Sequence, residues 1–204
     1  TLSIRLVRDN AGAVLAEFAY TAAFIFILGL IVFDFSLFFM RMAMAEYAAH
    51  VAVRIAAVRP AVCDDVPESI SKDPDDETTR YGTLCTDPAN PCEFPVPAVC
   101  SGAADAVSVE IMNRISPFLP PGATTGNLQF TYAPPANQSI GFLGGPYVPI
   151  VSVSLQNLTH DFILPIPTLL SPWSGGAGGG AFSINLPPMT ATMPGEDLNS
   201  GTEG

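Results

Sequence analysis

Four cysteines carry the clearest chemistry in this sequence, and all of them lie in one Pro- and Asp-rich stretch: Cys63, Cys85, Cys92 and Cys100. An even number of cysteines clustered in a loop-rich segment predicts two disulfides, with three possible pairings that the sequence leaves open. Zinc is the competing interpretation, but no histidine lies nearby, and spacings of 22, 7 and 8 positions do not form CxxC pairs. Two disulfides are therefore favoured over a metal site or free thiols.

The other reactive side chains form no catalytic pattern. His160 and Asp161 have no Ser or Cys in a nucleophile motif near them, and we interpret the pair as strand-end surface. The acidic run from Lys72 to Glu77 lacks the central Gly and closing Glu of a calcium loop, so a solvated loop is favoured over calcium binding. The chain also has no phosphate loop or dinucleotide fingerprint. We therefore expect no catalytic residues, no enzyme activity and no cofactor.

An apolar run from Phe18 to Met40 dominates the first part of the chain. Its residues are nearly all Phe, Ile, Leu, Val or Ala, and about 20 such residues cross a hydrocarbon core of ~30 Å. A cleaved secretory signal has a shorter apolar core, whereas this run continues past Met40 into more helix-forming sequence. The run predicts a retained, single transmembrane helix in contact with membrane lipid.

Asp34 is the only charged residue inside that run. An aspartate in the outer third of a membrane span usually faces protein or water, where it can pair with a cationic neighbour. The alternative is that Asp34 simply reaches the headgroup region. The sequence does not separate these two interpretations.

Composition divides the chain between Arg59 and Pro60. All 20 prolines lie at or after Pro60, as do 15 of the 17 glycines, so one long helix is possible only before this boundary. Residues 1–59 hold five arginines and four carboxylates, a net charge of +1, whereas residues 60–204 hold three basic and 15 acidic residues, a net charge of −12. Such an acidic second part argues against nucleic acid as a partner.

The long helix is expected to continue beyond the membrane as a stalk, giving one helix over residues 13–58. Glu46, His50 and Arg54 recur every four residues as a polar stripe. The apolar face that could pack on the next domain consists of Met44, Val51, Ile55 and Val58.

The rest of the chain predicts a small α+β domain. A short amphipathic helix is expected over residues 103–115, and strands are expected at 127–132, 147–158, 181–186 and, more weakly, 189–193. An antiparallel sheet of three or four strands packed on the long helix is the economical assembly. The predicted organisation is a leader-like segment (1–12), a transmembrane and stalk helix (13–59), an α+β domain (60–194) and a disordered acidic tail (195–204).

Orientation follows from two observations. Arg5 and Arg8 favour a cytoplasmic N-terminus, although arginines on the other flank of the span weaken this argument. The predicted disulfides need an oxidising compartment, so we expect the second part of the chain to lie outside the cytoplasm.

The segment Asn10-Ala11-Gly12-Ala13-Val14-Leu15-Ala16-Glu17-Phe18, followed by an apolar helix, resembles the start of the TadE-like family of Tad (Flp) pilus minor pseudopilins. In the second part the resemblance is one of layout: a strand at 150–155, a Pro-flanked apolar stretch at 162–165 and a late strand at 190–193. The resemblance implies a pilin-like membrane-anchored fold. It also implies a subunit of the bacterial inner membrane with a periplasmic domain, other pilus subunits as partners and a role in pilus assembly.

The resemblance further implies that prepilin peptidase cuts after Gly12, which makes Ala13 the new N-terminus and Glu17 the fifth residue. Glu17 would then pair with the free α-amino group of a neighbouring subunit and set the register of assembly. Its simpler interpretation is an interfacial carboxylate favoured by the helix dipole. The rival function is an uncleaved single-span accessory subunit of a larger membrane complex, and a third is an adhesive binding head.

Overall fold

The computed structural model describes residues 10–72, 78–86, 92–102, 105–136, 140–164 and 183–196 of the 204-residue chain. Parts of six predicted segments lie outside the described residues: the leader up to residue 9, the acidic run at 73–77, the helix start at 103–104, residue 165 of the apolar stretch, the strand start at 181–182 and the tail from residue 197. The chain forms two compact units. The first unit is residues 1–40 with 161–184, and the second unit is residues 41–160 with 185–204.

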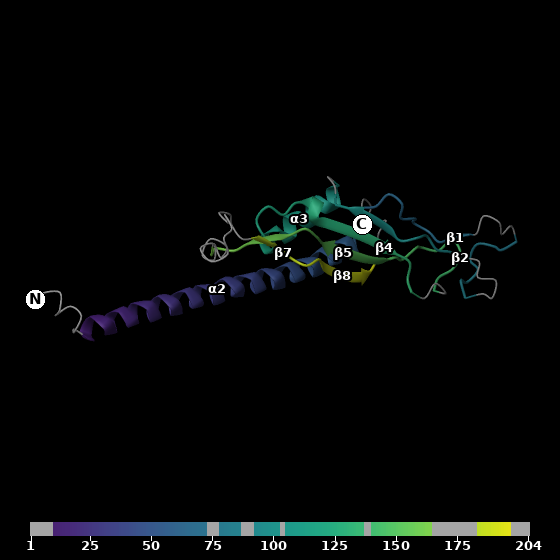
Figure 1. Cartoon of the computed structure of the whole chain (residues 1–204). Coiled ribbons are helices and arrows are strands. Elements are labelled where there is room, and N and C mark those ends of the chain that lie inside the picture. The colour runs from purple at the N-terminus through teal and green to yellow at the C-terminus, as the bar shows by residue number, and fades with distance from the viewer. Residues whose placement is uncertain are drawn as a thin grey trace, which may run out of the picture. The chain divides into compact units, whose positions relative to one another are not determined.

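The longest element is α2, a single helix of 47 residues over Asn10–Ala56 (Figure 1). At ~1.5 Å per residue its length is about 70 Å. No proline interrupts it, since the first proline of the chain is Pro60. The predicted continuous helix is therefore confirmed, and it ends two residues earlier than expected, in a turn where the Ala57 N–H donates to the Val53 carbonyl (2.9 Å).

The second unit is built on a four-stranded antiparallel sheet with the order β3-β4-β5-β8. These strands are β3 (Ala98–Ser101), β4 (Leu128–Ala133), β5 (Ile150–Leu155) and β8 (Met189–Pro194). In β4 the buried residues alternate with half-buried ones, and Phe130 lies opposite Val153 in the middle of the sheet. The strands expected around 127–132, within 147–158 and at 189–193 are confirmed.

Two expectations about the sheet were wrong. The strand β3 was not predicted, because prolines lie just before it, yet it forms a sheet edge with Cys100 opposite Phe130. The strand expected at 181–186 does not join this sheet, since β8 already occupies the second edge of β5. Instead, β7 (Ser183–Asn185) pairs with β6 (Thr159–Asp161) as a separate two-stranded sheet. A second two-stranded sheet pairs β1 (Ser71–Lys72) with β2 (Cys92–Glu93) in the predicted loop.

A short helix, α3 (Ala106–Ile115), packs its Ile111 and Ile115 side chains into the core. Asp105 caps its start, and the carboxylate accepts hydrogen bonds from the N–H groups of Val107 (2.9 Å) and Ser108 (3.4 Å). Because of this cap, the described helix begins three residues later than predicted. Two single-turn 3₁₀ helices follow, η1 (Ser116–Phe118) and η2 (Thr125–Asn127).

The last turns of α2 pack through alanines rather than through the larger residues that the sequence indicated. The residues that are 2% exposed or less are Ala45, Ala48, Ala49, Ala52, Val53, Ala56 and Ala57. The predicted apolar face is therefore wrong, since Met44 and Val58 are exposed and Val51 and Ile55 are only half-buried. Small side chains allow the helix backbone to approach its neighbours closely, which large ones at these positions would prevent. Glu46, His50 and Arg54 are exposed, as expected.

Candidate functional site on the long helix

Large apolar side chains surround the first part of α2 and are exposed on every side of it. Between Val14 and Leu30 the exposed fractions of these side chains run from 41% at Leu30 to 79% at Tyr20. Five consecutive residues from Phe24 to Leu28 are all exposed, so the surface is not a single stripe. A helix that is apolar on all sides needs lipid or other apolar helices around it. Among the described residues, Gly12–Ala56 is the one helix long and apolar enough to cross a membrane.

Gly12, Ala13 and Glu17 lie in the first two turns of α2, and all three are exposed. No atom lies within 4 Å of the position that a Cβ at Gly12 would take, so the glycine is not needed for packing inside the chain. The Glu17 carbonyl accepts a hydrogen bond from the Thr21 hydroxyl. No described cation forms an ion pair with the Glu17 carboxylate, which leaves this group available to a partner outside the described chain.

Asp34 is 2% exposed and is bound by backbone N–H groups from a distant part of the sequence. Its Oδ1 accepts from the N–H of Ile163 (3.2 Å), and its Oδ2 accepts from the N–H of Leu164 (2.9 Å). Hydrogen bonds from two N–H groups satisfy a carboxylate without a cation. Asp34 therefore faces protein, as one of the two interpretations expected, and its partners are backbone N–H groups rather than a cation.

Phe162, which precedes Ile163 and Leu164, also packs against the helix. Its ring centroid lies 5.6 Å from that of Phe35, in an edge arrangement, and 6.0 Å from that of Phe38, in a stacked arrangement. Phe162 is 6% exposed, and the residue before it, Asp161, is exposed. We call residues 161–164 the strap, because this segment contacts α2 at Asp34, Phe35 and Phe38.

The strap begins at the end of β6, where burial alternates from residue to residue. His160 on this strand is 8% exposed, so its interpretation as surface was wrong, whereas that of Asp161 was right. The alternation of a strand turns the two side chains to opposite faces. Of the predicted Pro-flanked stretch at 162–165, Pro165 lies outside the described residues.

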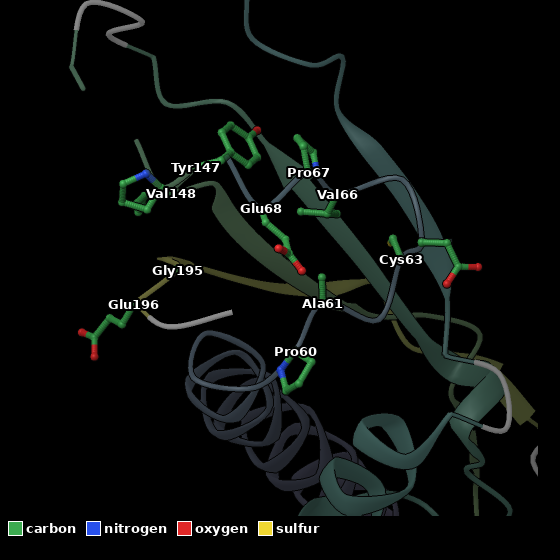
Figure 2. Close-up of a pocket in the computed structure, with 12 residues that line it drawn as sticks. Pro60, Ala61, Cys63, Val66, Pro67, Glu68, Tyr147, Val148, Gly195 and Glu196 are labelled. Atoms are coloured by element: carbon green, nitrogen blue, oxygen red, sulfur yellow. The ribbon is translucent and has the colours of Figure 1, made fainter. Parts of the chain in front are cut away.

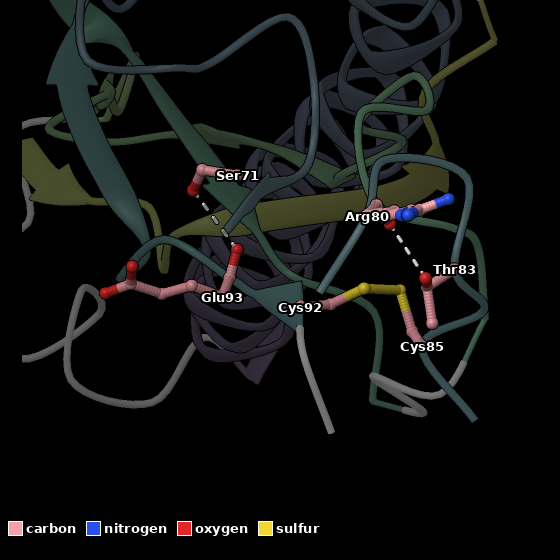
Figure 3. Close-up of a disulfide and its surroundings, with 6 residues drawn as sticks. All are labelled: Ser71, Arg80, Thr83, Cys85, Cys92 and Glu93. Carbon is pink, nitrogen blue, oxygen red and sulfur yellow. Dashed lines mark hydrogen bonds between the residues drawn. A yellow bond between two sulfur atoms is a disulfide. The ribbon is translucent and has the colours of Figure 1, made fainter. Parts of the chain in front are cut away.

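The four cysteines form two disulfides, which confirms the predicted number and decides the pairing. Cys63 bonds to Cys100 and Cys85 bonds to Cys92, with Cα–Cα distances of 5.7 and 5.3 Å. The first disulfide joins the chain leaving α2 to strand β3, and the second closes a short loop onto strand β2. Figure 3 shows the second disulfide beside two further restraints, in which the Thr83 hydroxyl donates to the Arg80 carbonyl (2.7 Å) and the Ser71 hydroxyl to the Glu93 carbonyl (3.5 Å).

An ion pair also holds the end of α2 to α3. Arg59 donates through Nε and Nη2 to the two carboxylate oxygens of Glu110, at 3.1 and 3.0 Å. The hydrogen bond from Arg59 lowers the pKa of Glu110, and the same bond raises the pKa of Arg59. Because both side chains are well exposed, water and salt screen the pair, and it orients the helices more than it stabilises them.

A hollow lies beside the chain that leaves α2, with Pro60, Ala61 and Pro67 on its wall (Figure 2). Its lining includes three carboxylates, from Asp64, Glu68 and Glu196. The N–H of Glu196 donates to the Ala57 carbonyl (2.9 Å), which ties the end of β8 to the end of the helix. Among the described residues no group of His, Cys, Asp or Glu side chains is arranged to hold a metal ion.

No protein-family model, curated protein or solved structure matches this chain. The resemblance to TadE-like pseudopilins therefore remains a prediction that depends on residues 10–18 and on the layout of the second part. The described geometry brings none of Gly12, Ala13 and Glu17 near Asp34 along the helix, since Asp34 lies 17 positions after Glu17. The sequence analysis singled out the apolar stretch at 162–165 but not its contact with Asp34, because Ile163 and Leu164 are 129 and 130 positions away along the chain.

Proposed function

We propose that this chain is a structural subunit anchored by α2 in the bacterial inner membrane, with its N-terminus in the cytoplasm and the second unit in the periplasm. The observation that carries the proposal is the apolar surface on every side of the helix between Val14 and Leu30. Contact of such a surface with water is unfavourable in free energy, whereas contact with lipid tails is not. The two disulfides support a location of the second unit in an oxidising compartment.

Membrane anchoring is tested by fractionation. We expect the full chain to stay with the membrane pellet after extraction at high salt and at alkaline pH, and to enter solution only with detergent. Recovery of the folded chain in the aqueous fraction without detergent would contradict the anchoring.

Within this class we propose a TadE-like minor pseudopilin that contributes to the biogenesis of a Tad-type pilus. Glu17 supports the proposal, because an exposed carboxylate lies within the apolar part of the helix without a described ion-pair partner. A carboxylate in that position is costly unless it is paired. The α-amino group of Ala13, freed in a neighbouring subunit by cleavage after Gly12, has the charge and the place to pair with it.

One observation favours the second candidate, an uncleaved accessory subunit of a larger membrane complex. The bond between Gly12 and Ala13 lies inside α2, two residues after the helix begins at Asn10. A protease would have to unwind this first turn before it could cut there. Helix ends fray, so this first turn disfavours cleavage without forbidding it.

Mass analysis of the N-terminus separates the two candidates. In cells with prepilin peptidase we expect the N-terminus to be Ala13, and in cells without it an N-terminus before Gly12. Gly12→Leu should abolish the cut. The control is Gly29→Leu, because Gly29 lies in the same helix with equally open surroundings. An N-terminus that is identical in both strains would exclude a processed pseudopilin and leave the membrane anchoring intact.

A further inference from the structure

We infer that Asp34 and the strap mark the outer limit of the lipid-embedded part of α2, so that the hydrocarbon band covers residues 14–33 rather than 18–40. The inference rests on the proposed membrane anchoring and refines it. Residues 14–33 are sufficient for a span, because about 20 residues cross a core of ~30 Å. Residues 35–39 then fall in the headgroup layer, which is about 5–7 Å thick on each side.

The backbone of the strap is the first argument. Residues 162–164 are neither helix nor strand, and Ile163 is 71% exposed. Asp34 accepts the N–H groups of Ile163 and Leu164. Exposed backbone that is neither helix nor strand is nevertheless not found in contact with lipid tails, where its remaining polar groups have no water to bind. Since the strap binds α2 at Asp34, the hydrocarbon region must end before that residue.

The charge on the strap is the second argument. Asp161 is exposed, and it immediately precedes Phe162, whose ring contacts Phe35 and Phe38. An exposed carboxylate at this level of the helix is compatible with headgroups and water but not with the bilayer core. The turn from Phe35 to Phe38 therefore lies at or beyond the membrane surface, although its side chains are apolar.

The N-terminal boundary of the lipid-embedded part of α2 must shift together with its C-terminal boundary. If lipid contact ends at Phe33, a full span needs to begin near Val14, and Val14 and Leu15 supply apolar side chains that are 64% and 73% exposed. Glu17 then lies one turn inside the hydrocarbon, instead of at its edge. The two carboxylates of the helix differ accordingly: Asp34 is satisfied by the strap, whereas Glu17 needs a partner from another molecule.

The position of the band is measured by placing nitroxide labels along the helix. Single cysteines are introduced into the full chain, with its native disulfides intact, and the protein is reconstituted in phosphatidylethanolamine and phosphatidylglycerol vesicles. Suitable positions are exposed ones: Leu15, Phe18, Phe26, Val32 and Phe39. Collision with oxygen, which concentrates in hydrocarbon, is compared with collision with a water-soluble nickel chelate.

We expect the greatest depth midway between Ala23 and Phe24, the centre of residues 14–33, and ready access of the chelate to a label at Phe39. A maximum at Gly29, the centre of residues 18–40, would overturn the inference and leave the membrane anchoring standing. The two centres differ by about 8 Å, at ~1.5 Å per residue. Access of the chelate to every label would overturn the membrane anchoring itself and the inference with it.

Discussion

At the scale of single residues, Asp34 shows how a charge is accommodated within an apolar helix. Its two carboxylate oxygens each accept one backbone N–H, and its side chain is buried by the strap. Hydrogen bonds to an ionised carboxylate are among the stronger ones, typically about 1.5–3 kcal/mol each. The strap is therefore held by a group whose removal affects two hydrogen bonds at once.

Replacing Asp34 tests this bond directly. In Asp34→Leu we expect hydrogen exchange at the amides of Ile163 and Leu164 to rise at least tenfold, because a loss of about 1.4 kcal/mol already corresponds to tenfold. Asp34→Asn keeps one carbonyl acceptor and should give a smaller increase. The amide of Leu186 donates to the Leu158 carbonyl (2.7 Å) and serves as the internal control. Unchanged protection of both strap amides in Asp34→Leu would show that the carboxylate does not hold the strap.

Tyr132 plays a similar part in the second unit. The tyrosine is 1% exposed, and its hydroxyl accepts the N–H of Val62 (3.1 Å), next to Cys63. Burial raises the pKa of the phenol, while the bond from Val62 acts in the opposite direction. Tyr132→Phe would leave the Val62 N–H without this acceptor, which costs about 1–2 kcal/mol.

The expected result for Tyr132→Phe is a fall of this size in the free energy of unfolding of the full chain, measured in detergent micelles by denaturant titration. Tyr81→Phe is the matched control, because Tyr81 is 76% exposed. Equal stability of the two variants would mean that water replaces the hydroxyl as the acceptor for Val62.

At the scale of elements, α2 has two surfaces with opposite demands. Between Val14 and Leu30 its large side chains point outward in all directions, as lipid contact requires. Over the last turns it presents alanines that are fully buried in the second unit. One uninterrupted helix can thus serve as anchor and as core element because the size of its side chains changes along its length.

Enlarging the alanine face should destabilise the second unit. In Ala52→Leu the added atoms have no room, since Ala52 is 0% exposed, and we expect a loss of about 1–3 kcal/mol in the free energy of unfolding. The matched control is Ala43→Leu, which changes an exposed alanine in the same helix and should be nearly neutral. Chemical unfolding followed by near-UV circular dichroism measures both. A neutral Ala52→Leu would imply that the packing against this face is loose.

At the scale of the whole molecule, covalent links and an ion pair restrain the chain where it leaves the helix. The Cys63–Cys100 disulfide bridges 37 positions and connects this exit to the sheet, whereas Cys85–Cys92 bridges only 7. Closing the longer loop removes more freedom from the unfolded chain. The acidic second part, with a net charge of −12 over residues 60–204, repels itself and benefits from such links.

Removing the disulfides one at a time should therefore give unequal effects. Replacing Cys63 and Cys100 by serine is expected to cost about 4 kcal/mol, and replacing Cys85 and Cys92 about 2.5 kcal/mol, from loop length alone. Thermal unfolding of the two double variants under non-reducing conditions measures the difference. A larger loss for the Cys85 and Cys92 pair would show that local packing around Ile70, Leu143 and Tyr147 outweighs loop entropy.

Local pattern determined much of this molecule before any tertiary contact was considered. The absence of proline before Pro60 predicts one long helix, and alternation predicts β4 around Phe130, because both depend only on neighbours in the chain. The clustering of four cysteines likewise predicts two disulfides, though not their partners. The apolar composition of residues 18–40 predicts a membrane helix with no reference to the rest of the fold.

Only the tertiary structure decided which distant residues meet. It paired Cys63 with Cys100, placed β3 in the main sheet and excluded β7 from it, and chose the alanine face around Ala52 for packing. It also brought Ile163 and Leu164 to Asp34, which moves the inferred limit of the membrane band. These outcomes depend on competition among contacts between residues many positions apart. The periodicity of a single segment does not determine which distant segment it packs against.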